Sequence, residues 1–532
     1  MLNGNGSYFV LGSGPAGVSC AAALLKKGAR VTMLDSGIEL EAERAAYVHD
    51  LAQREPETWD ERALSRLKEN VSASGSGIPL KYAYGSDFPY RDPANDQPIT
   101  ARGVGVLPSM AKGGLSNVWG AVVLPYRQED MRGWPVTASE LAEHYRAVFA
   151  FMPLAGRRDD LQNWFDLYAD HPQRLDLSPQ ADAFLQDLEA SRQELAGRDI
   201  HFGASRLALS SQSDGVHACA YCGQCMYGCP YELPYNSAAT VESFRGNPNF
   251  EYRPGILVKR LSEKPGGVRI EAFELATRTA VTFTADRVFA ACGVLPTTKL
   301  IATSLEAFNK PLTLLDSQYF LLPMLRYRGV REFDTARIHT LAQVFLEIFD
   351  PAVADLGVHL QVYTYNDLFQ AALRSILGPL LPLVRWPVRA MLGRLLLIQG
   401  YLPSELSSSI SAVLMRSGDE SELQLSPRAN PMTRPALGRV VRKLNENRHL
   451  LRAVPFPGMI RPGTPGRGFH VGGAFPMRDK PQALECDRQG RPYGMERIHI
   501  VDATCFPSIP ATTITLTAMA NAHRIGVEAT EL

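Results

Sequence analysis

The stretch "SYFVLGSGPAGVSCAAALLKKGARVTMLD", from Ser7 to Asp35, predicts a strand, a tight turn, a helix and a second strand ending in an acid. Gly12, Gly14 and Gly17 have the G-x-G-x-x-G spacing. The first glycine permits the turn, the second lets a pyrophosphate approach the backbone, and the third lets the helix pack on the strand. The helix N-terminus offers free N–H groups to phosphates, and Asp35 can accept hydrogen bonds from ribose hydroxyls. The stretch therefore predicts a dinucleotide-binding unit, for either FAD or NAD.

The composition of the 532-residue chain is that of an ordinary globular protein, with 45% hydrophobic and 21% charged residues. Its length suggests about three domain-sized units. Lys+Arg and Asp+Glu balance at 55 each, so no overall basic field points to nucleic acid. The N-terminus lacks the features of a signal peptide, and no apolar run is long enough for a simple membrane-spanning helix. We therefore expect a cytoplasmic protein.

Three further segments resemble the glucose–methanol–choline (GMC) flavoprotein oxidoreductases. "FHVGGAFPM", from Phe469, and "IHIVDATCFPSIPATTITLTAMANAHRIG", from Ile498, resemble the closing signature of that family. "AKGGLSNVWGAVVLP", Ala111 to Pro125, is similar to the loop that the family lays along the flavin, and "ADRVFAACGVLPTTKLI" to its turn behind FAD. The resemblance implies that the dinucleotide is FAD.

A chain that returns to one cofactor from both ends implies a discontinuous cofactor domain. We expect an α/β fold, α+β overall, in which residues 1–135, 216–300 and 465–532 form a Rossmann-like FAD-binding domain. Residues 136–215 and 301–464 then form a sheet-based substrate domain that roofs the flavin. "YFLLPMLRYRGV", "HLQVYTYND" and "SSSISAVLMR" have strand-like patterns and are the expected strands of this roof.

The resemblance implies a catalytic role for His470, at the family's position for the base. A neutral imidazole can remove the hydroxyl proton of an alcohol while hydride moves to the flavin. At the second position, where relatives have His or Asn, this chain has Thr513, with Thr512 as a one-residue alternative. A hydroxyl can hold a substrate oxygen but cannot share a proton as an imidazole does. His523 is expected to be a surface or packing residue.

The candidate cofactor-binding residues come from the glycine turn, the strand after it, the Ala111–Pro125 loop and two later segments. They are Gly12, Gly14, Gly17, Asp35, Gly113, Gly114, Ser116, Asn117, Val258 and Asp502.

The stretch "CAYCGQCMYGCP" places four of the eight cysteines, Cys219, Cys222, Cys225 and Cys229, within eleven residues. The C-x2-C-x2-C-x3-C-P spacing is typical of ferredoxin iron–sulfur ligands, whereas zinc sites more often show two separated C-x-x-C pairs. A purely structural cysteine loop is the third alternative. The strip resembles one in the FAD-bearing large subunits of bacterial membrane-bound sugar dehydrogenases. That resemblance implies Cys219, Cys225 and Cys229 as cluster ligands. Cys222 is an addition to the pattern, and an extra thiolate ligand would favour a [4Fe–4S] cluster over a [3Fe–4S] cluster. The other cysteines are expected in the core: Cys20, Cys292, Cys486 and Cys505.

Residues 367–400 form a basic, apolar insert with no acidic residue between Asp367 and Glu405. Its arginines, its leucines and Trp386 suit an element that lies on anionic lipid, and its prolines break it into short helical pieces. A buried hairpin that faces the core or a partner subunit is the alternative. On lipid, the protein would be peripheral and its substrate could be a lipid-linked alcohol.

Together these features predict an FAD-dependent oxidoreductase that oxidises a CH–OH group of a sugar or sugar-like alcohol. The iron–sulfur cluster would relay electrons to an external acceptor protein. One alternative is an oxidase of the same fold that returns electrons to oxygen and has structural cysteines. The other is a non-catalytic flavin/iron–sulfur electron-transfer subunit.

Overall fold

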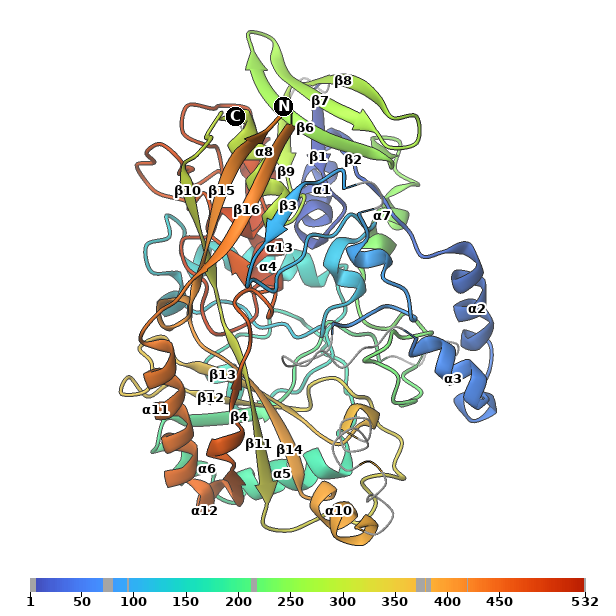
Figure 1. Cartoon of the computed structure of the whole chain (residues 1–532), viewed down its shortest axis with the longest axis vertical. Helices are drawn as coiled ribbons and strands as arrows, with labels where there is room; N and C mark the ends of the chain where they lie inside the picture. The colour runs from blue at the N-terminus through green and yellow to red at the C-terminus, as the bar shows by residue number, and fades with distance from the viewer. Residues whose placement is uncertain are drawn as a thin grey trace.

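The computed structural model describes residues 6–69, 80–92, 95–211, 218–369, 378, 384–418 and 420–530 (Figure 1). Helices and strands are mixed along the whole chain. In Figure 1 the first and last elements lie together in the upper half, and a second sheet with its own helices occupies the lower half. The predicted α/β fold class is confirmed.

The upper half contains a parallel sheet with the strand order β20-β9-β1-β2-β5, built from both ends of the chain. Its strands are β1 (Ser7–Leu11), β2 (Arg30–Leu34), β5 (Phe250–Arg253), β9 (Arg287–Ala290) and β20 (Ile498–Ile500). The helices α1 (Pro15–Lys26) and α13 (Thr515–Ala529) pack against each other beside it. Their approach is close at Gly526, where an added Cβ would lie 3.0 Å from the Cys20 carbonyl oxygen. The two ends of the sequence thus form one unit.

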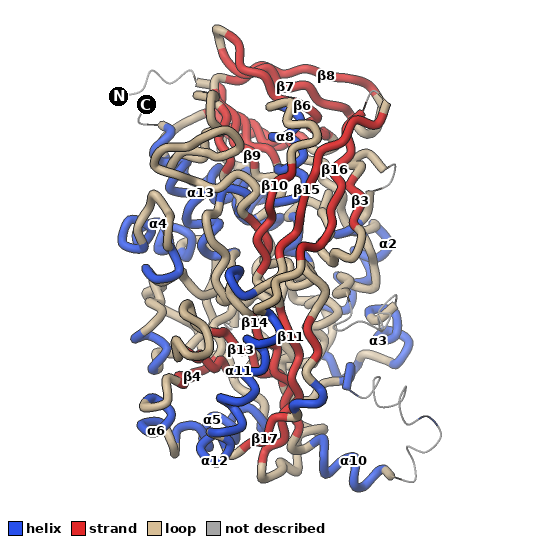
Figure 2. Tube along the Cα trace, turned by 60° about the vertical axis from the view of Figure 1, so that its left-hand side comes forward, coloured by secondary structure: helices blue, strands red, loops and turns tan. Residues whose placement is uncertain are grey.

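Two further sheets complete the upper half. One is a hairpin sheet of β6 (Ile256–Lys264), β7 (Gly267–Glu274) and β8 (Thr279–Ala285). The other has the order β19-β10-β15-β16-β3, with β3 (Ile99–Ala101), β10 (Pro311–Asp316), β15 (Ser409–Ser417), β16 (Glu420–Arg428) and β19 (Val471–Gly472). Figure 2 shows β10, β15 and β16 side by side. The predicted strand "SSSISAVLMR" is β15, which belongs to this sheet and not to the lower sheet that holds the other two predicted roof strands.

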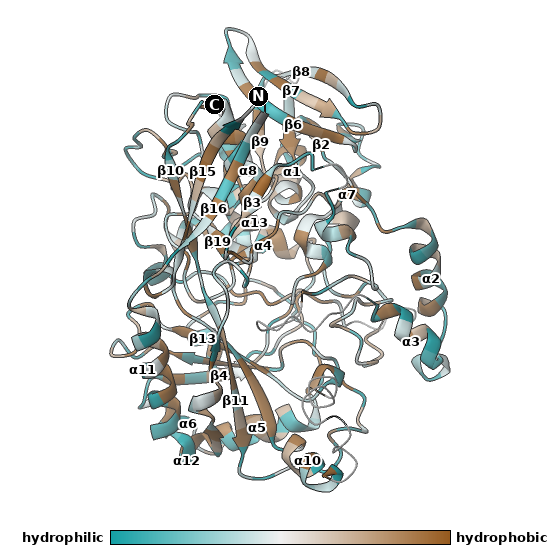
Figure 3. Ribbon diagram, viewed as in Figure 1, coloured by the Kyte–Doolittle hydropathy of each residue, from teal (hydrophilic) through white to brown (hydrophobic). Residues whose placement is uncertain are grey.

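The lower half is built on a seven-stranded sheet with the order β17-β11-β14-β13-β12-β4, in which β18 also pairs with β11. Its strands are β4 (Ile200–Ala204), β11 (Tyr319–Arg326), β12 (Val344–Ile348), β13 (Val358–Tyr363), β14 (Leu395–Tyr401), β17 (Ala453–Pro455) and β18 (Arg461–Pro462). Alternate residues of a strand face opposite sides, so Val358, Leu360 and Val362 pack with helices on one face. These helices are α5 (Pro179–Glu189), α6 (Arg192–Ala196), α11 (Thr433–Glu446) and α12 (Arg448–Leu451). In Figure 3, β11 carries the hydrophobic colour over much of its length.

The other α-helices of the described residues are α2 (Ala42–Ala52), α3 (Glu61–Leu67), α4 (Ala138–Phe149), α7 (Ser237–Phe244), α8 (Val294–Ser304) and α10 (Arg385–Leu392). A capping box between Thr137 and Glu140 begins α4. Among the described residues, no helix has both the length and the apolarity needed to cross a membrane.

The basic insert is only partly described, because residues 370–377 and 379–383 lie outside the described ranges. In its described part, α10 exposes 71% of Trp386 and Arg389 pairs with Asp334. The leucine run after α10 is not helical: it is β14, whose Leu396 and Ile398 are buried in the sheet. The sequence reading of short helical pieces is therefore wrong for residues 395–400, and lipid contact stays a prediction.

Candidate active site

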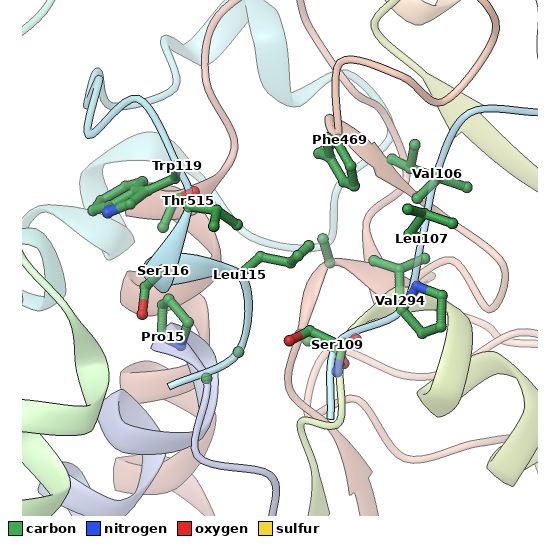
Figure 4. A pocket seen from close by; sticks show the side chains of 18 of the residues that line it. Pro15, Val106, Leu107, Ser109, Leu115, Ser116, Trp119, Val294, Phe469 and Thr515 are labelled. Carbon is green, nitrogen blue, oxygen red and sulfur yellow. The ribbon is translucent and has the colours of Figure 1, made fainter. Parts of the chain in front are cut away.

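A cavity of about 390 Å³ lies where residues of the parallel sheet and of the seven-stranded sheet meet. Its walls come from the glycine turn, the 106–122 loop, the 291–296 turn, the 467–471 loop and the start of α13. Figure 4 shows Pro15, Ser116 and Trp119 on one side of this space, and Val294 and Phe469 on the other. The cavity thus joins segments that are far apart in the sequence.

The glycine turn has the geometry that its spacing predicts. Gly12 has φ +96°, and an added Cβ would lie 2.5 Å from the Ala291 carbonyl oxygen. A Cβ at Gly17 would lie 2.0 Å from the Gly12 oxygen, so this residue packs the helix onto the turn and does not line the cavity. At Gly14, which lines the cavity, a Cβ would meet no protein atom within 4 Å. Open space therefore lies at the N-terminus of α1, as pyrophosphate binding requires.

The Ala111–Pro125 loop faces this open space with two of its predicted residues. Gly114 and Ser116 line the cavity, and a Cβ on Gly114 would lie 3.5 Å from the Gly14 Cα. Gly113 and Asn117 do not line it but support the loop: the Gly113 N–H donates to Ser13 Oγ (2.8 Å) and Asn117 Nδ2 donates to the Gly114 oxygen (2.7 Å). A side chain at Gly114 would therefore touch Gly14, so the loop and the glycine turn approach each other closely.

Asp35 lines the cavity at the end of β2, where the sequence predicts a ribose contact. Its Oδ2 accepts hydrogen bonds from Ser13 Oγ and from the Tyr252 hydroxyl, the latter at 2.9 Å. Burial raises the pKa of Asp35 to about 6, against the opposing effect of these hydrogen bonds. Ser13 and Tyr252 were missed by the sequence reasoning because only the fold brings them to this carboxylate.

Asp502 lines the cavity, but neighbouring groups already use its oxygens. It accepts hydrogen bonds from the Gly293 N–H (3.0 Å), from Thr297 Oγ1 (2.6 Å) and from the Thr504 N–H (2.9 Å). Burial raises its pKa. Asp502 therefore holds the turn behind the cavity in place, and Val258 lines the cavity near that turn.

His470 reaches the cavity from the loop before β19. Its ring stacks on Tyr401, with ring centroids 4.6 Å apart and an interplanar angle of 22°. Nδ1 is buried and has no hydrogen-bond partner among the described residues, so no protein group competes for it there. Burial lowers the pKa of His470 to about 3. The imidazole is therefore neutral at physiological pH, as a proton acceptor must be.

The two candidate threonines differ in position. Thr513 lines the cavity, and its Oγ1 accepts a hydrogen bond from the Leu124 N–H at 3.2 Å, which leaves its own hydrogen for a ligand. The Thr512 hydroxyl is buried, does not line the cavity and has no partner within the described part of the chain. Of the two, Thr513 is thus the one that can reach a ligand. His523 is buried between α13 and α4, where its Nδ1 lies 2.9 Å from that of His144.

The seven-stranded sheet adds a polar wall that the sequence reasoning did not identify. The wall consists of cavity-lining residues from β11, β13 and β14: Tyr319, Gln361, Tyr363, Gln399 and Tyr401. They lie on the face opposite the apolar helix-packed face. The available signal was the alternation in "HLQVYTYND", where polar and aromatic residues occupy every second position.

The four clustered cysteines are free and none lines the cavity. Burial raises the pKa of Cys219 to about 12 and of Cys222 to about 11. Tyr221, Gly223 and Gly228 have positive φ, so the segment turns repeatedly. Over the described ranges, no group of three or more His, Cys, Asp or Glu side chains could hold a metal ion. As arranged, Cys219, Cys222, Cys225 and Cys229 do not form the predicted ligand set, and the iron–sulfur prediction has no support.

The other four cysteines were expected in the core. Cys20, Cys486 and Cys505 are buried, whereas Cys292 is half-buried and lines the cavity.

Comparisons with known proteins agree with this geometry. Residues 458–522 match the family model described as GMC oxidoreductase. A search of curated protein sequences found no significant match. Pyridoxine 4-oxidase from Mesorbium loti has a similar structure, with a TM-score of 0.59, 14% identity, and coverage of 99% of this chain and 100% of that one. An FAD-dependent oxidoreductase from Chaetomium thermophilum has a TM-score of 0.58 and 12% identity, and 99% of each chain is covered. At these identities the likeness shows the fold. Residues 458–522 are thus similar to the GMC oxidoreductases, and the chain as a whole shares the fold of these two flavoproteins.

Proposed function

We propose that this chain is an FAD-dependent oxidoreductase that oxidises a CH–OH group of a sugar-like alcohol. One observation carries the proposal: a single cavity runs from the open space at Gly14 to the His470 ring and the polar wall. The open space at Gly14 and the N-terminus of α1 fit a pyrophosphate. Asp35 fits a ribose hydroxyl.

Bound FAD supplies a hydride acceptor, and the protein's own residues handle the substrate proton. The His470 imidazole takes the hydroxyl proton, because burial keeps it neutral and its lone pair available. Stacking on Tyr401 holds the ring in one orientation. The Thr513 hydroxyl donates to the substrate oxygen, since its own oxygen is already held by the Leu124 N–H.

The polar wall supports a sugar-like substrate. Tyrosine rings pack against the C–H faces of a sugar ring, and the amides of Gln361 and Gln399 can bond its hydroxyls. No aspartate or glutamate belongs to the wall as defined above. A neutral, hydroxyl-rich ligand suits this surface better than a charged or purely aliphatic one.

Anaerobic flavin reduction tests the proposal. Sugars and cyclic polyols should bleach the oxidised flavin band, and straight-chain aliphatic alcohols of similar size should do so much more slowly. Dithionite serves as the control for a reducible flavin. Failure of every sugar and polyol, with rapid reduction by aliphatic alcohols, would contradict the substrate class. Hydrogen peroxide formed in air, compared with reduction of a one-electron dye, then distinguishes an oxidase from a dehydrogenase.

Cys225→Ser should leave substrate reduction of the flavin within about twofold of the wild-type rate. The reason is that Cys225 does not line the cavity and Ser has nearly its size. Stopped-flow reduction and iron analysis of anaerobically purified protein make the comparison. A tenfold slower reduction would show that the cysteine segment is coupled to the cavity. About three to four irons per wild-type chain, absent from the variant, would restore the cluster prediction.

A further inference from the structure

The polar wall contains a chain of buried hydrogen bonds that ends at the cavity. Glu347 Oε1 lies 2.7 Å from His359 Nδ1, and the two side chains are 2% and 1% exposed. His359 Nε2 lies 3.2 Å from Gln361 Nε2. The Tyr363 hydroxyl donates to Gln361 Oε1 at 3.1 Å. Glu347 and His359 are outside the cavity lining, whereas Gln361 and Tyr363 belong to it.

The chemistry of these groups gives the chain one direction. An amide nitrogen only donates hydrogen bonds, so its contact with Gln361 Nε2 makes His359 Nε2 an acceptor and places the His359 proton on Nδ1, facing the Glu347 carboxylate. His359 Nε2 then presents a lone pair, which accepts from the Gln361 amide NH₂. The Gln361 carbonyl consequently points to Tyr363 and takes its hydroxyl hydrogen. The Tyr363 oxygen is left with lone pairs toward the cavity, so it acts as an acceptor. Arg127 and Arg206 place two positive charges near the Glu347 carboxylate.

Tyr401, on the neighbouring strand β14, is a hydrogen-bond donor where Tyr363 is an acceptor. Gln399 Nε2 donates to the Tyr401 hydroxyl at 2.5 Å, which leaves the Tyr401 hydrogen free to donate. The Tyr401 ring is held between His470 at 4.6 Å and His359 at 6.1 Å. Gln361 and Gln399 are direct cross-strand partners, so the two polar pairs are adjacent on β13 and β14. The wall thus offers one fixed acceptor and one fixed donor.

We propose that Tyr363 is a specificity-determining residue that binds a second hydroxyl of the substrate, and that Glu347 and His359 are positioning residues that make it an acceptor. A hydroxyl group can satisfy both sites at once, because it donates to Tyr363 and accepts from Tyr401. The preferred substrate is therefore a diol or polyol with a hydroxyl next to the one that is oxidised. This inference rests on the proposed function, in that it takes the polar wall as the substrate wall.

A matched pair of probes tests this inference by binding alone. trans-1,2-Cyclohexanediol and cyclohexanol have the same ring and differ by one hydroxyl. Isothermal titration of the holoenzyme should give about tenfold tighter binding of the diol, the factor expected for a satisfied buried hydrogen bond. Tyr363→Phe should remove this preference, because it should weaken the binding of the diol and leave the binding of cyclohexanol unchanged. Glu347→Gln should reduce it in the same direction, because the neutral amide no longer fixes the His359 proton.

The control variant is Tyr327→Phe, which removes the same hydroxyl from a side chain that is 45% exposed and outside the cavity lining. It should keep the full preference for the diol. Melting temperature and flavin content identify a variant that is simply misfolded. If Glu347→Gln is misfolded, the result for Tyr363→Phe decides whether the inference holds. Equal binding of the two probes by the wild type, no binding of either, or a preference that survives Tyr363→Phe overturns the inference. A preference lost in Tyr363→Phe upholds it even if neither probe reduces the flavin, and in that case the proposed function fails instead.

Discussion

His470→Ala should retain its flavin and reduce it with alcohols at least about a hundredfold more slowly, the usual cost of losing a general base. His470 lines the cavity, and its Nδ1 has no hydrogen-bond partner among the described residues. Removing the ring leaves the hydroxyl proton without an acceptor on that side. Anaerobic stopped-flow reduction with the best sugar or polyol measures the rate, and the flavin spectrum before mixing confirms that the cofactor is bound.

His449→Ala is the matched control, because it removes an exposed imidazole on α12, outside the cavity lining. Its reduction rate should equal that of the wild type. The pH profile gives a second check. A base whose pKa is lowered to about 3 is deprotonated throughout the range from pH 5 to pH 8, so the wild-type rate should be flat there. An unchanged rate in His470→Ala would mean that another residue is the base. A wild-type rate that falls as the pH drops through about 6.5 would mean that the His470 ring has an ordinary pKa.

The sequence predicts those parts of the fold that local patterns encode. The glycine turn works within one strand–helix–strand unit, and β1, α1 and β2 have the predicted order and nearly the predicted bounds. The closing signature, from Phe469 to the last helix, predicts that the chain returns to the first sheet. In the structure β20 pairs with β9 of that sheet, and α13 packs on α1. Two of the three predicted roof strands, β11 and β13, form in the seven-stranded sheet.

What the sequence did not predict depends on long-range pairing. The pattern of "HLQVYTYND" predicts a strand. Its pairing with β12 and β14, which the pattern does not encode, brings Gln361 and Tyr363 to the cavity. The leucines of β14 were read as helical, because an apolar run does not distinguish a buried strand from a helix. The cysteine spacing fixes only the distance along the chain. Turns at Tyr221, Gly223 and Gly228 set where the thiols lie.

Gly14→Val should fold normally and retain less than about a tenth of the wild-type flavin. An added Cβ at Gly14 meets no protein atom within 4 Å, so the protein itself has room for a side chain there. That room belongs to the cavity, and it is where the pyrophosphate must approach the backbone. The valine therefore competes with the cofactor and not with the fold. The flavin-to-protein ratio after incubation with excess FAD, together with the melting temperatures of the apo forms, measures both effects.

Two other glycines separate loss of cofactor from loss of fold. Gly246→Val also adds a side chain into open space, but Gly246 is exposed and outside the cavity, so both flavin and melting temperature should stay unchanged. Gly17→Ala places a Cβ 2.0 Å from the Gly12 oxygen and should lower the melting temperature even of the apo form. A full flavin spectrum in Gly14→Val would mean that the pyrophosphate does not lie at the N-terminus of α1. A fall in apo stability as large as that of Gly17→Ala would mean that the space at Gly14 is needed by the protein. Only loss of flavin with an intact fold assigns that space to the cofactor.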